Sequence, residues 1–325
     1  MNNLQQIQGI TFENTNEYGP GEVVGYHAKP SPIFRNKALP VDVQGLKSED
    51  RRVIKMEGEE AISKYTIGFE IEKTVLFRSA VKEYPLFCGF ERDGSCGYEA
   101  VTHVLPLLPK SLWRTKVFNM FKQAEKIIDD RYSPSDHKCG GHITIAVDGI
   151  SGYELQQAIR KNAGIIYALF RKRLTNNYCR FDIFMDADEA RGLFVHNSSK
   201  YRVSKVMTDC LEFRLPSRVQ SVKQMMRRYE LMYEIVDFSI NNPNGTFNTL
   251  LKKVTPIIKS MYEGDMEKVN EILSLSKSFR KMILTKKVNK EVLPYVDKFR
   301  QLDARLYYDR SLMRNVDTNT NNDIF

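Results

Sequence analysis

The sequence lacks the features that would place a protein in or across a membrane. It has no apolar run near the roughly 20 residues that a spanning helix needs. Its first residues, MNNLQQIQGITFENTNEYGPGE, have neither the basic start nor the apolar core of a signal peptide. We therefore expect a cytoplasmic protein with no membrane partner.

The cysteines are few, and none forms a Cys-x-x-Cys pair. Five are scattered along the chain: Cys88, Cys96, Cys139, Cys179 and Cys210. An odd, scattered set argues against a disulfide framework and against a ribbon-type zinc site, and it suits a reducing compartment. Each is expected to be a small buried residue.

A glycine-rich P-loop is also missing, so a nucleotide would have to be held in another way. What the chain does have is length and positive charge. Its 325 residues, 42% of them hydrophobic and 27% charged, are typical of a globular protein. The net charge of +9 indicates an anionic partner, such as a nucleotide, a nucleic acid or an acidic substrate.

Composition and periodicity divide the chain into four parts. Residues 1–60 predict an extended arm, 61–240 a body of mixed strands and helices, 241–315 a helical region interrupted at Pro294, and 316–325 a disordered tail. Because the strands and helices do not alternate strictly, we expect an α+β fold. Its sheet should be largely antiparallel, with helices packed on one face.

Acidic residues recur on the strands of the body. In GFEIEK, Glu70 and Glu72 share one face, opposite Phe69 and Ile71. Two other predicted strands also carry acids. In LEFR, Glu212 and Arg214 share one face. In ERDGSCGYEAV, Asp93 lies at a turn and Glu99 on the strand that follows it. A lone Glu-x-Glu is usually a solvated face. Several together predict one sheet face that gathers acids, and grouped carboxylates need a counter-charge such as Mg²⁺ or Mn²⁺.

The stretch CGGHITIAVDG adds a histidine to this set. Alternation places His142, Thr144 and Ala146 on one face and Ile143, Ile145 and Val147 on the core face. The two preceding glycines, Gly140 and Gly141, would let a backbone or a ligand approach closely. His142 is therefore expected to point away from the core.

In this order, GFEIEK, ERDGSCGYEAV, CGGHITI and LEFR resemble motifs of the phage and bacterial amidoligases, which are carboxylate–amine ligases with a glutamine-synthetase-like fold. The resemblance covers residues 67–216. It implies a phage-type or bacterial ligase, and the cytoplasm in which it acts would be that of the host if a phage encodes it. The arm and the helical C-terminal region lie outside it.

The resemblance assigns roles motif by motif. It implies that metal is held by Glu70, Glu72, Glu99 and Glu212. His142 would face a metal or the nucleotide phosphates, and Arg214 the phosphoryl group in transfer. Many members carry a second histidine two residues after the first, where this chain has Thr144, a poor metal ligand.

Further residues follow from the same resemblance. Asp93 and Ser95 match the Asp-Gly-Ser turn, and Gly140 and Gly141 would leave room for the nucleotide. The stretches RLTNNYCR and KYRVSKV resemble the family's Arg/Tyr segments. The resemblance implies that Asp93 is catalytic, together with His142 and Arg214. It implies that the nucleotide is contacted by Ser95, Gly140, Gly141, Arg180 and Arg202.

The activity implied is ATP-dependent. A substrate carboxylate attacks the γ-phosphate of ATP to give an acyl phosphate, and an amine then displaces phosphate to form an amide or peptide bond. Positioning and cations are what this chemistry requires of a protein. The carboxylate and the amine could come from an amino acid, a peptide or a protein.

Four other interpretations stay open. Asp136, His137, Cys139 and His142 could bind zinc, although their spacing matches no standard site. Cys139 or Cys96 could be a nucleophile. Residues 277–290, with MMRRY (Met225–Tyr229), could bind nucleic acid, or the fold could serve as a virion-associated scaffold without catalysis.

Overall fold

The computed structural model describes the following residues: 10–12, 54–56, 64–76, 81, 84, 86–93, 96–102, 104–129, 138–147, 149–176, 178–179, 202–207, 210–285 and 287–296. Of residues 10–12, 54–56 and 88–93 it describes the backbone alone. The predicted tail and most of the predicted arm lie outside these residues. From residues 1–60 come β1 (Ile10–Phe12) and β2 (Ile54–Met56), which pair antiparallel.

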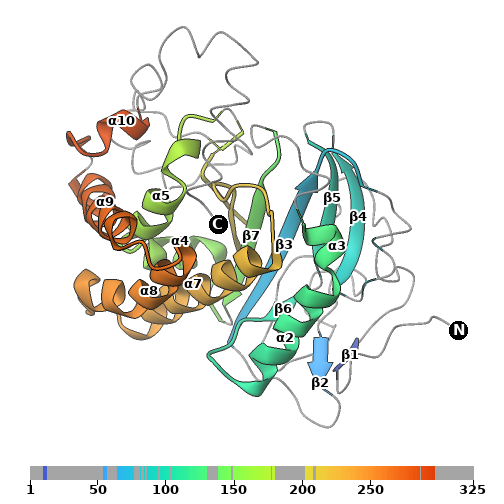
Figure 1. The fold of residues 1–325 in the computed structure, drawn as a ribbon. Helices are drawn as coiled ribbons and strands as arrows, with labels where there is room; N and C mark the ends of the chain where they lie inside the picture. Colours follow the sequence, from blue (N-terminus) through green and yellow to red (C-terminus); the bar gives the residue numbers. More distant parts are fainter. Residues whose placement is uncertain are drawn as a thin grey trace, which may run out of the picture.

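The centre of the described structure is an open antiparallel sheet of seven strands (Figure 1). Its order is β4-β5-β3-β7-β9-β8, with β6 paired to one end of β3. The strands are β3 (Tyr65–Lys73), β4 (Phe87–Asp93), β5 (Gly97–Thr102), β6 (Leu105–Pro106), β7 (Gly141–Val147), β8 (Ser204–Val206) and β9 (Cys210–Phe213). The expected mixture of helices with a largely antiparallel sheet is confirmed.

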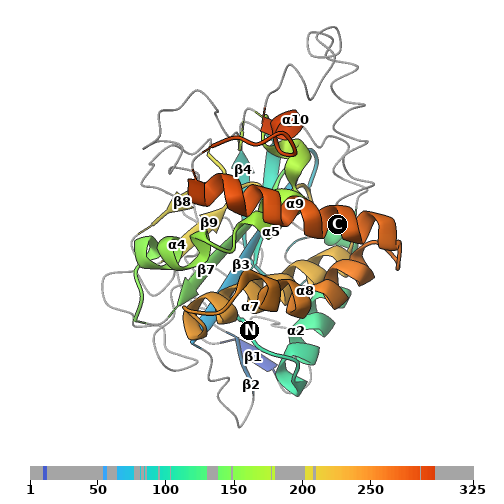
Figure 2. The same cartoon turned by 90° about the vertical axis from the view of Figure 1, so that its left-hand side faces the viewer.

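Helices lie on one side of the sheet, some packed on the strands and others on those helices. They are α2 (Leu112–Gln123), α3 (Glu125–Ile128), α4 (Gly152–Arg160), α5 (Gly164–Leu169), the 3₁₀ turn η3 (Arg171–Arg173), α7 (Val222–Asn241), α8 (Phe247–Met261), α9 (Met266–Thr285) and α10 (Leu293–Val296). Figure 2 looks onto this helical layer, with the strands behind it. Among the described residues, no helix is both long enough and apolar enough to cross a bilayer.

The alternating residues of the strands divide the sheet into two chemically different faces. Phe69 and Ile71 of β3 and Ile143 and Ile145 of β7 lie on the core face, each at most 1% exposed. Phe69 meets Phe121 of α2 edge to face, with ring centroids 5.8 Å apart. Burying one such side chain contributes about 1.5–3 kcal/mol, so the core face is fixed firmly and the polar residues between must point the other way.

One predicted helix is divided in the structure. The pattern of residues 152–174 predicts a continuous amphipathic helix, but α4 ends at Arg160 and α5 begins at Gly164. Two contacts hold the turn between them. Arg280 Nε donates to Lys161 O at 3.0 Å, and Asn162 Nδ2 donates to Ser239 Oγ at 2.8 Å. Tertiary contacts from α9 and α7 therefore override the local helical period.

The C-terminal helices share the hydrophobic core with the rest of the described chain. The interruption predicted at Pro294 falls earlier, since α9 ends at Thr285 and Pro294 lies in the first turn of α10. Proline suits that position because the first helical N–H groups have no partner within the helix. A second proline, Pro256, lies inside α8.

Candidate metal centre

Four neighbouring strands carry the predicted acids to one place, on the face opposite the hydrophobic core. The register pairs Glu72 of β3 with Glu99 of β5, and Glu70 of β3 with His142 of β7. On the next strand along the sheet, Glu212 of β9 lies opposite Thr144 of β7. Residues directly opposite in neighbouring strands share a face.

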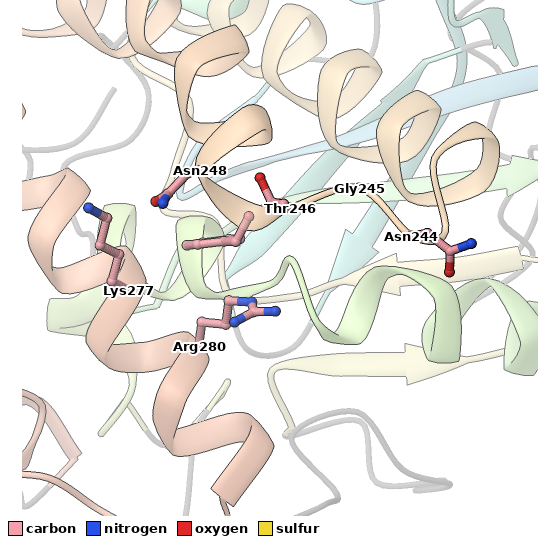
Figure 3. A pocket seen from close by; sticks show the side chains of 7 residues that line it. Asn244, Gly245, Thr246, Asn248, Lys277 and Arg280 are labelled. Carbon is pink, nitrogen blue, oxygen red and sulfur yellow. The ribbon is translucent and has the colours of Figure 1, made fainter.

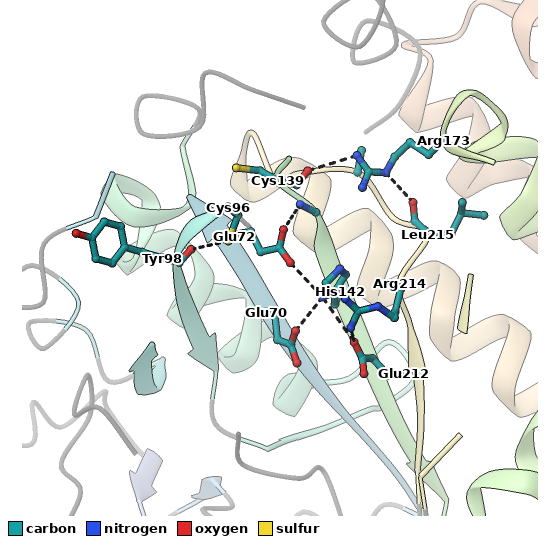
Figure 4. Close-up of polar contacts among 12 residues, drawn as sticks. Glu70, Glu72, Cys96, Tyr98, Cys139, His142, Arg173, Glu212, Arg214 and Leu215 are labelled. Atoms are coloured by element: carbon teal, nitrogen blue, oxygen red, sulfur yellow. Dashed lines mark hydrogen bonds and ion pairs between the residues drawn. The ribbon is translucent and has the colours of Figure 1, made fainter. Parts of the chain in front are cut away.

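His142 lies at the middle of this cluster (Figure 4). Its Nδ1 atom is 2.9 Å from Glu70 Oε2, 3.3 Å from Glu72 Oε1 and 3.6 Å from Glu212 Oε1. The predicted orientation of His142, away from the core and toward the acids, is thus seen directly. One ring nitrogen faces carboxylates from two different strands.

Two of the acids near the histidine accept a hydrogen bond from another residue. The backbone N–H of Gly140 donates to Glu72 Oε2, and Arg214 Nη1 donates to Glu212 Oε1. Burial opposes the charge of Arg214, but Glu212, Glu70 and Glu72 outweigh it and raise its pKa above the ordinary value. Arg214 is therefore a permanent cation at the edge of the cluster.

The cluster is buried. Glu70, Glu72, Glu99, His142 and Glu212 are each between 2% and 7% exposed. Carboxylates withdrawn from water are unfavourable unless they are paired or bind a cation. Four carboxylates with one arginine and one histidine carry excess negative charge, which a divalent cation would neutralise.

The ligand atoms fall into two groups. Glu70, His142 and Glu212 form one, and Glu72, Cys96 and Glu99 form the other; within each group the ligand atoms lie within 4.8 Å of one another. The groups adjoin, because Glu72 Oε1 lies 3.3 Å from the His142 ring. Oxygen and imidazole donors of this kind suit Mg²⁺ or Mn²⁺ in the first group.

The glycines of the GGH motif allow other parts of the protein to approach closely, which is one of the two alternatives that the sequence left open. A Cβ on Gly140 would lie 2.9 Å from His142 Nε2 and 3.4 Å from Glu72 Oε2. A Cβ on Gly141 would lie 2.5 Å from Ser217 O and 2.6 Å from Arg228 Nη1. Both glycines are thus required by close packing within the protein, and this explains them without the nucleotide that we predicted beside them.

The remaining predicted site residues are only partly placed. Asp93 ends β4 opposite Gly97, and its side chain is not among those described. Ser95 and Arg180 lie outside the described residues. Arg202 is half-buried just before β8, the neighbour of β9.

Two residues beside the cluster were missed. Lys205 of β8 lies opposite Glu212 and so shares its face, which places a second cation at that edge. Glu91 of β4 occupies the register position opposite Glu99. Strand β8 has only three residues, too few for alternation to be recognised, and Glu91 was hidden in a stretch interpreted mainly for its turn.

The nucleophile interpretation of Cys139 is weakened. Burial, with a smaller contribution from Glu72, raises the pKa of its thiol to about 11. Its sulfur lies 3.7 Å from Thr74 Oγ1. A protonated, buried thiol is a poor nucleophile. Of the proposed zinc set, Asp136 and His137 lie outside the described residues.

Two of the basic residues that could have bound nucleic acid make contacts within the protein instead. Arg228 of MMRRY is 1% exposed and donates to Ser217 O, Ser217 Oγ and Arg218 O. In the C-terminal run, Arg280 packs over the Phe247 ring at 5.1 Å. With Lys277 it lines a cavity of about 430 Å³ at the start of α8, apart from the carboxylates (Figure 3). These arginines serve internal packing.

No protein-family model matches this sequence, and no curated protein matches it. The resemblance to amidoligases therefore rests on its four motifs and stays a prediction.

Proposed function

We propose that the protein is an ATP-dependent carboxylate–amine ligase that works at this sheet face with Mg²⁺ or Mn²⁺. The observation that carries the proposal is the convergence of three carboxylates on His142, with Glu99 opposite Glu72 and Arg214 beside Glu212. The three are those of Glu70, Glu72 and Glu212. A structural role does not require four buried carboxylates on neighbouring strands. A site that must hold cations against phosphate oxygens does.

The donor set fits the metal. Glu70, Glu212 and His142 would hold one ion, with Glu72 and Glu99 beside them for another. When bound, such ions neutralise phosphate oxygens and orient the γ-phosphoryl group. The two faces of the sheet, with acids on one and helices on the other, are also what the proposed glutamine-synthetase-like fold would require.

Arg214 has the features of a group that stabilises phosphoryl transfer. Its Nη1 is committed to Glu212, whereas its Nε is buried and makes no hydrogen bond to the described residues. The guanidinium thus keeps a donor for an anionic oxygen next to the metal ligands. A planar fork of this kind can bind two phosphoryl oxygens at once.

His142 would serve as ligand and organiser rather than as an isolated base. Its Nδ1 atom faces the carboxylates, and its Nε2 atom lies against Gly140. Lys205, across the strand pair from Glu212, adds positive charge on the outer side, where a substrate carboxylate or an ATP phosphate would approach.

ADP release tests this proposal. The purified protein is incubated with Mg²⁺, ATP and pools of amino acids and peptides, beside Glu212→Gln and Glu291→Gln variants. We expect amine-dependent ADP release from the wild type and from the exposed Glu291→Gln control, and none from Glu212→Gln. Metal binding with no turnover against any pool would instead support a ligase-like scaffold, and nucleic acid retained at physiological salt would support the basic-surface alternative.

A further inference from the structure

The second ligand group contains a thiol, and a magnesium site built from carboxylates does not need one. Cys96 immediately precedes β5, whose Glu99 pairs with Glu72 of β3. The three side chains are 3%, 2% and 5% exposed, respectively, and their ligand atoms lie within 4.8 Å of one another. Figure 4 shows Cys96 beside Glu72 at the end of β3.

The backbone directs Cys96 to this position. Gly97 follows it with φ +115°, a conformation that favours glycine. A Cβ on Gly97 would lie 2.7 Å from Thr74 O and 3.2 Å from Lys73 O. The start of β5 therefore presses against the end of β3, and this close approach brings the thiol next to the Glu72 carboxylate.

The thiol and the two acids gather on the β5 side of β3. Cys96 Sγ lies 3.5 Å from the carbonyl oxygen of Tyr98, to which the thiol donates. His142 and Arg214 come from β7 and from the residue after β9, on the other side of β3. The side of Glu72 that faces β5 carries the two further ligands, Glu99 and Cys96.

The two ligand groups differ in chemical character. Glu70, Glu212 and His142 offer oxygen and imidazole donors, which Mg²⁺ or Mn²⁺ accepts. A thiolate with two carboxylates instead favours a thiophilic ion such as Zn²⁺ over Mg²⁺. The thiol would lose its proton on binding, since the thiolate is the ligand form.

We propose that Glu72, Cys96 and Glu99 form a second, thiophilic metal position beside the magnesium position. The proposal rests on the metal-dependent function proposed above, which it deepens, because it makes the two ions chemically distinct. It also makes Cys96 the point at which oxidation or a soft metal would act on the enzyme.

Cobalt spectroscopy tests it without any activity measurement. Co²⁺ bound to a thiolate gives an intense sulfur-to-metal charge-transfer band in the near ultraviolet, which oxygen and nitrogen ligands do not. We titrate metal-free wild type, Cys96→Ser, Glu99→Gln and Cys210→Ser with Co²⁺. Cys210→Ser is the matched control, because Cys210 is also buried on this sheet but belongs to β9.

We expect the band in the wild type and in Cys210→Ser, and no band in Cys96→Ser. In Glu99→Gln, the titration of the band should show a Co²⁺ affinity at least tenfold weaker than in the wild type. Added Zn²⁺ should abolish it, whereas millimolar Mg²⁺ should not. Absence of the band in the wild type, or its persistence in Cys96→Ser, would overturn the proposal.

The outcome is separable from that of the ligase proposal. If the band forms but ADP release is never seen, the thiophilic position stands and the ligase proposal fails. If Mg²⁺-dependent turnover is seen and the wild type gives no band, the ligase proposal stands and the thiolate position fails.

Discussion

Replacing Glu70 by Gln is expected to remove the response of the protein to metal without weakening the metal-free protein. Glu70 is 7% exposed, and its Oε2 lies 2.9 Å from His142 Nδ1, within reach of an ion held by His142 and Glu212. The amide oxygen of Gln can still accept the hydrogen bond from His142. The substitution also removes one negative charge from a cluster in which Glu72 and Glu212 approach the same nitrogen.

The magnitude follows from linkage. Mg²⁺ at about a hundredfold above its Kd stabilises the native state by about 2.7 kcal/mol. Loss of one ligand that weakens affinity about 100-fold leaves about 0.4 kcal/mol at the same concentration. At about 2 °C per kcal/mol for a chain of this size, the metal-induced rise in Tm should fall from about 5 °C to about 1 °C.

Differential scanning fluorimetry with and without millimolar Mg²⁺ or Mn²⁺ measures this shift, with the exposed Glu291→Gln variant as control. A Glu70→Gln protein that gains as much from metal as the wild type would refute the assignment. A large fall in its metal-free Tm would refute the reasoning about carboxylate repulsion.

Three further predictions follow from individual contacts. Arg214→Lys should lower kcat by about 10²–10³-fold with a smaller change in ATP affinity, since a lysine cannot reproduce the fork; equal losses of rate and affinity in steady-state kinetics would contradict this. Gly141→Ala should destabilise the protein by about 3 kcal/mol in urea unfolding, because its Cβ would meet Ser217 O at 2.5 Å, and an unchanged midpoint would contradict the packing. The Cys139 thiol, with its pKa raised to about 11, should resist alkylation in the native protein at pH 8, and its thiolate fraction should rise about tenfold per pH unit up to that pKa. Alkylation of the native protein at pH 8 as fast as in urea would contradict this.

The polar face was predictable because strand alternation is a local property. Phe69 and Ile71 must be buried against the helices, so Glu70 and Glu72 must point away, and the same reasoning oriented His142 and Glu212. Periodicity alone does not give the order of the strands. That β3 lies between β5 and β7 depends on pairing between segments far apart in the sequence, and only this order brings Glu99 to Glu72 and His142 to Glu70.

What the sequence could not reveal depends on long-range packing. Cys96 was interpreted as a buried hydrophobic residue, because nothing local shows that Gly97 presses it against β3. Gly140 and Gly141 were expected to admit either a backbone or a ligand, and only the folded chain shows that the His142 ring, Ser217 and Arg228 lie beside them. Arg228 was counted as surface charge but lies within the core.

The most direct test of the central claim is the position of a bound ion. Crystals grown with Mn²⁺ and a non-hydrolysable ATP analogue would locate manganese by its anomalous scattering. We predict a peak within coordination distance of Glu70, Glu212 and His142, with the analogue's γ-phosphate next to it and within hydrogen-bond reach of Arg214. Manganese and nucleotide bound elsewhere, with the His142–Glu70 contact intact and no ion among the four carboxylates, would contradict the account.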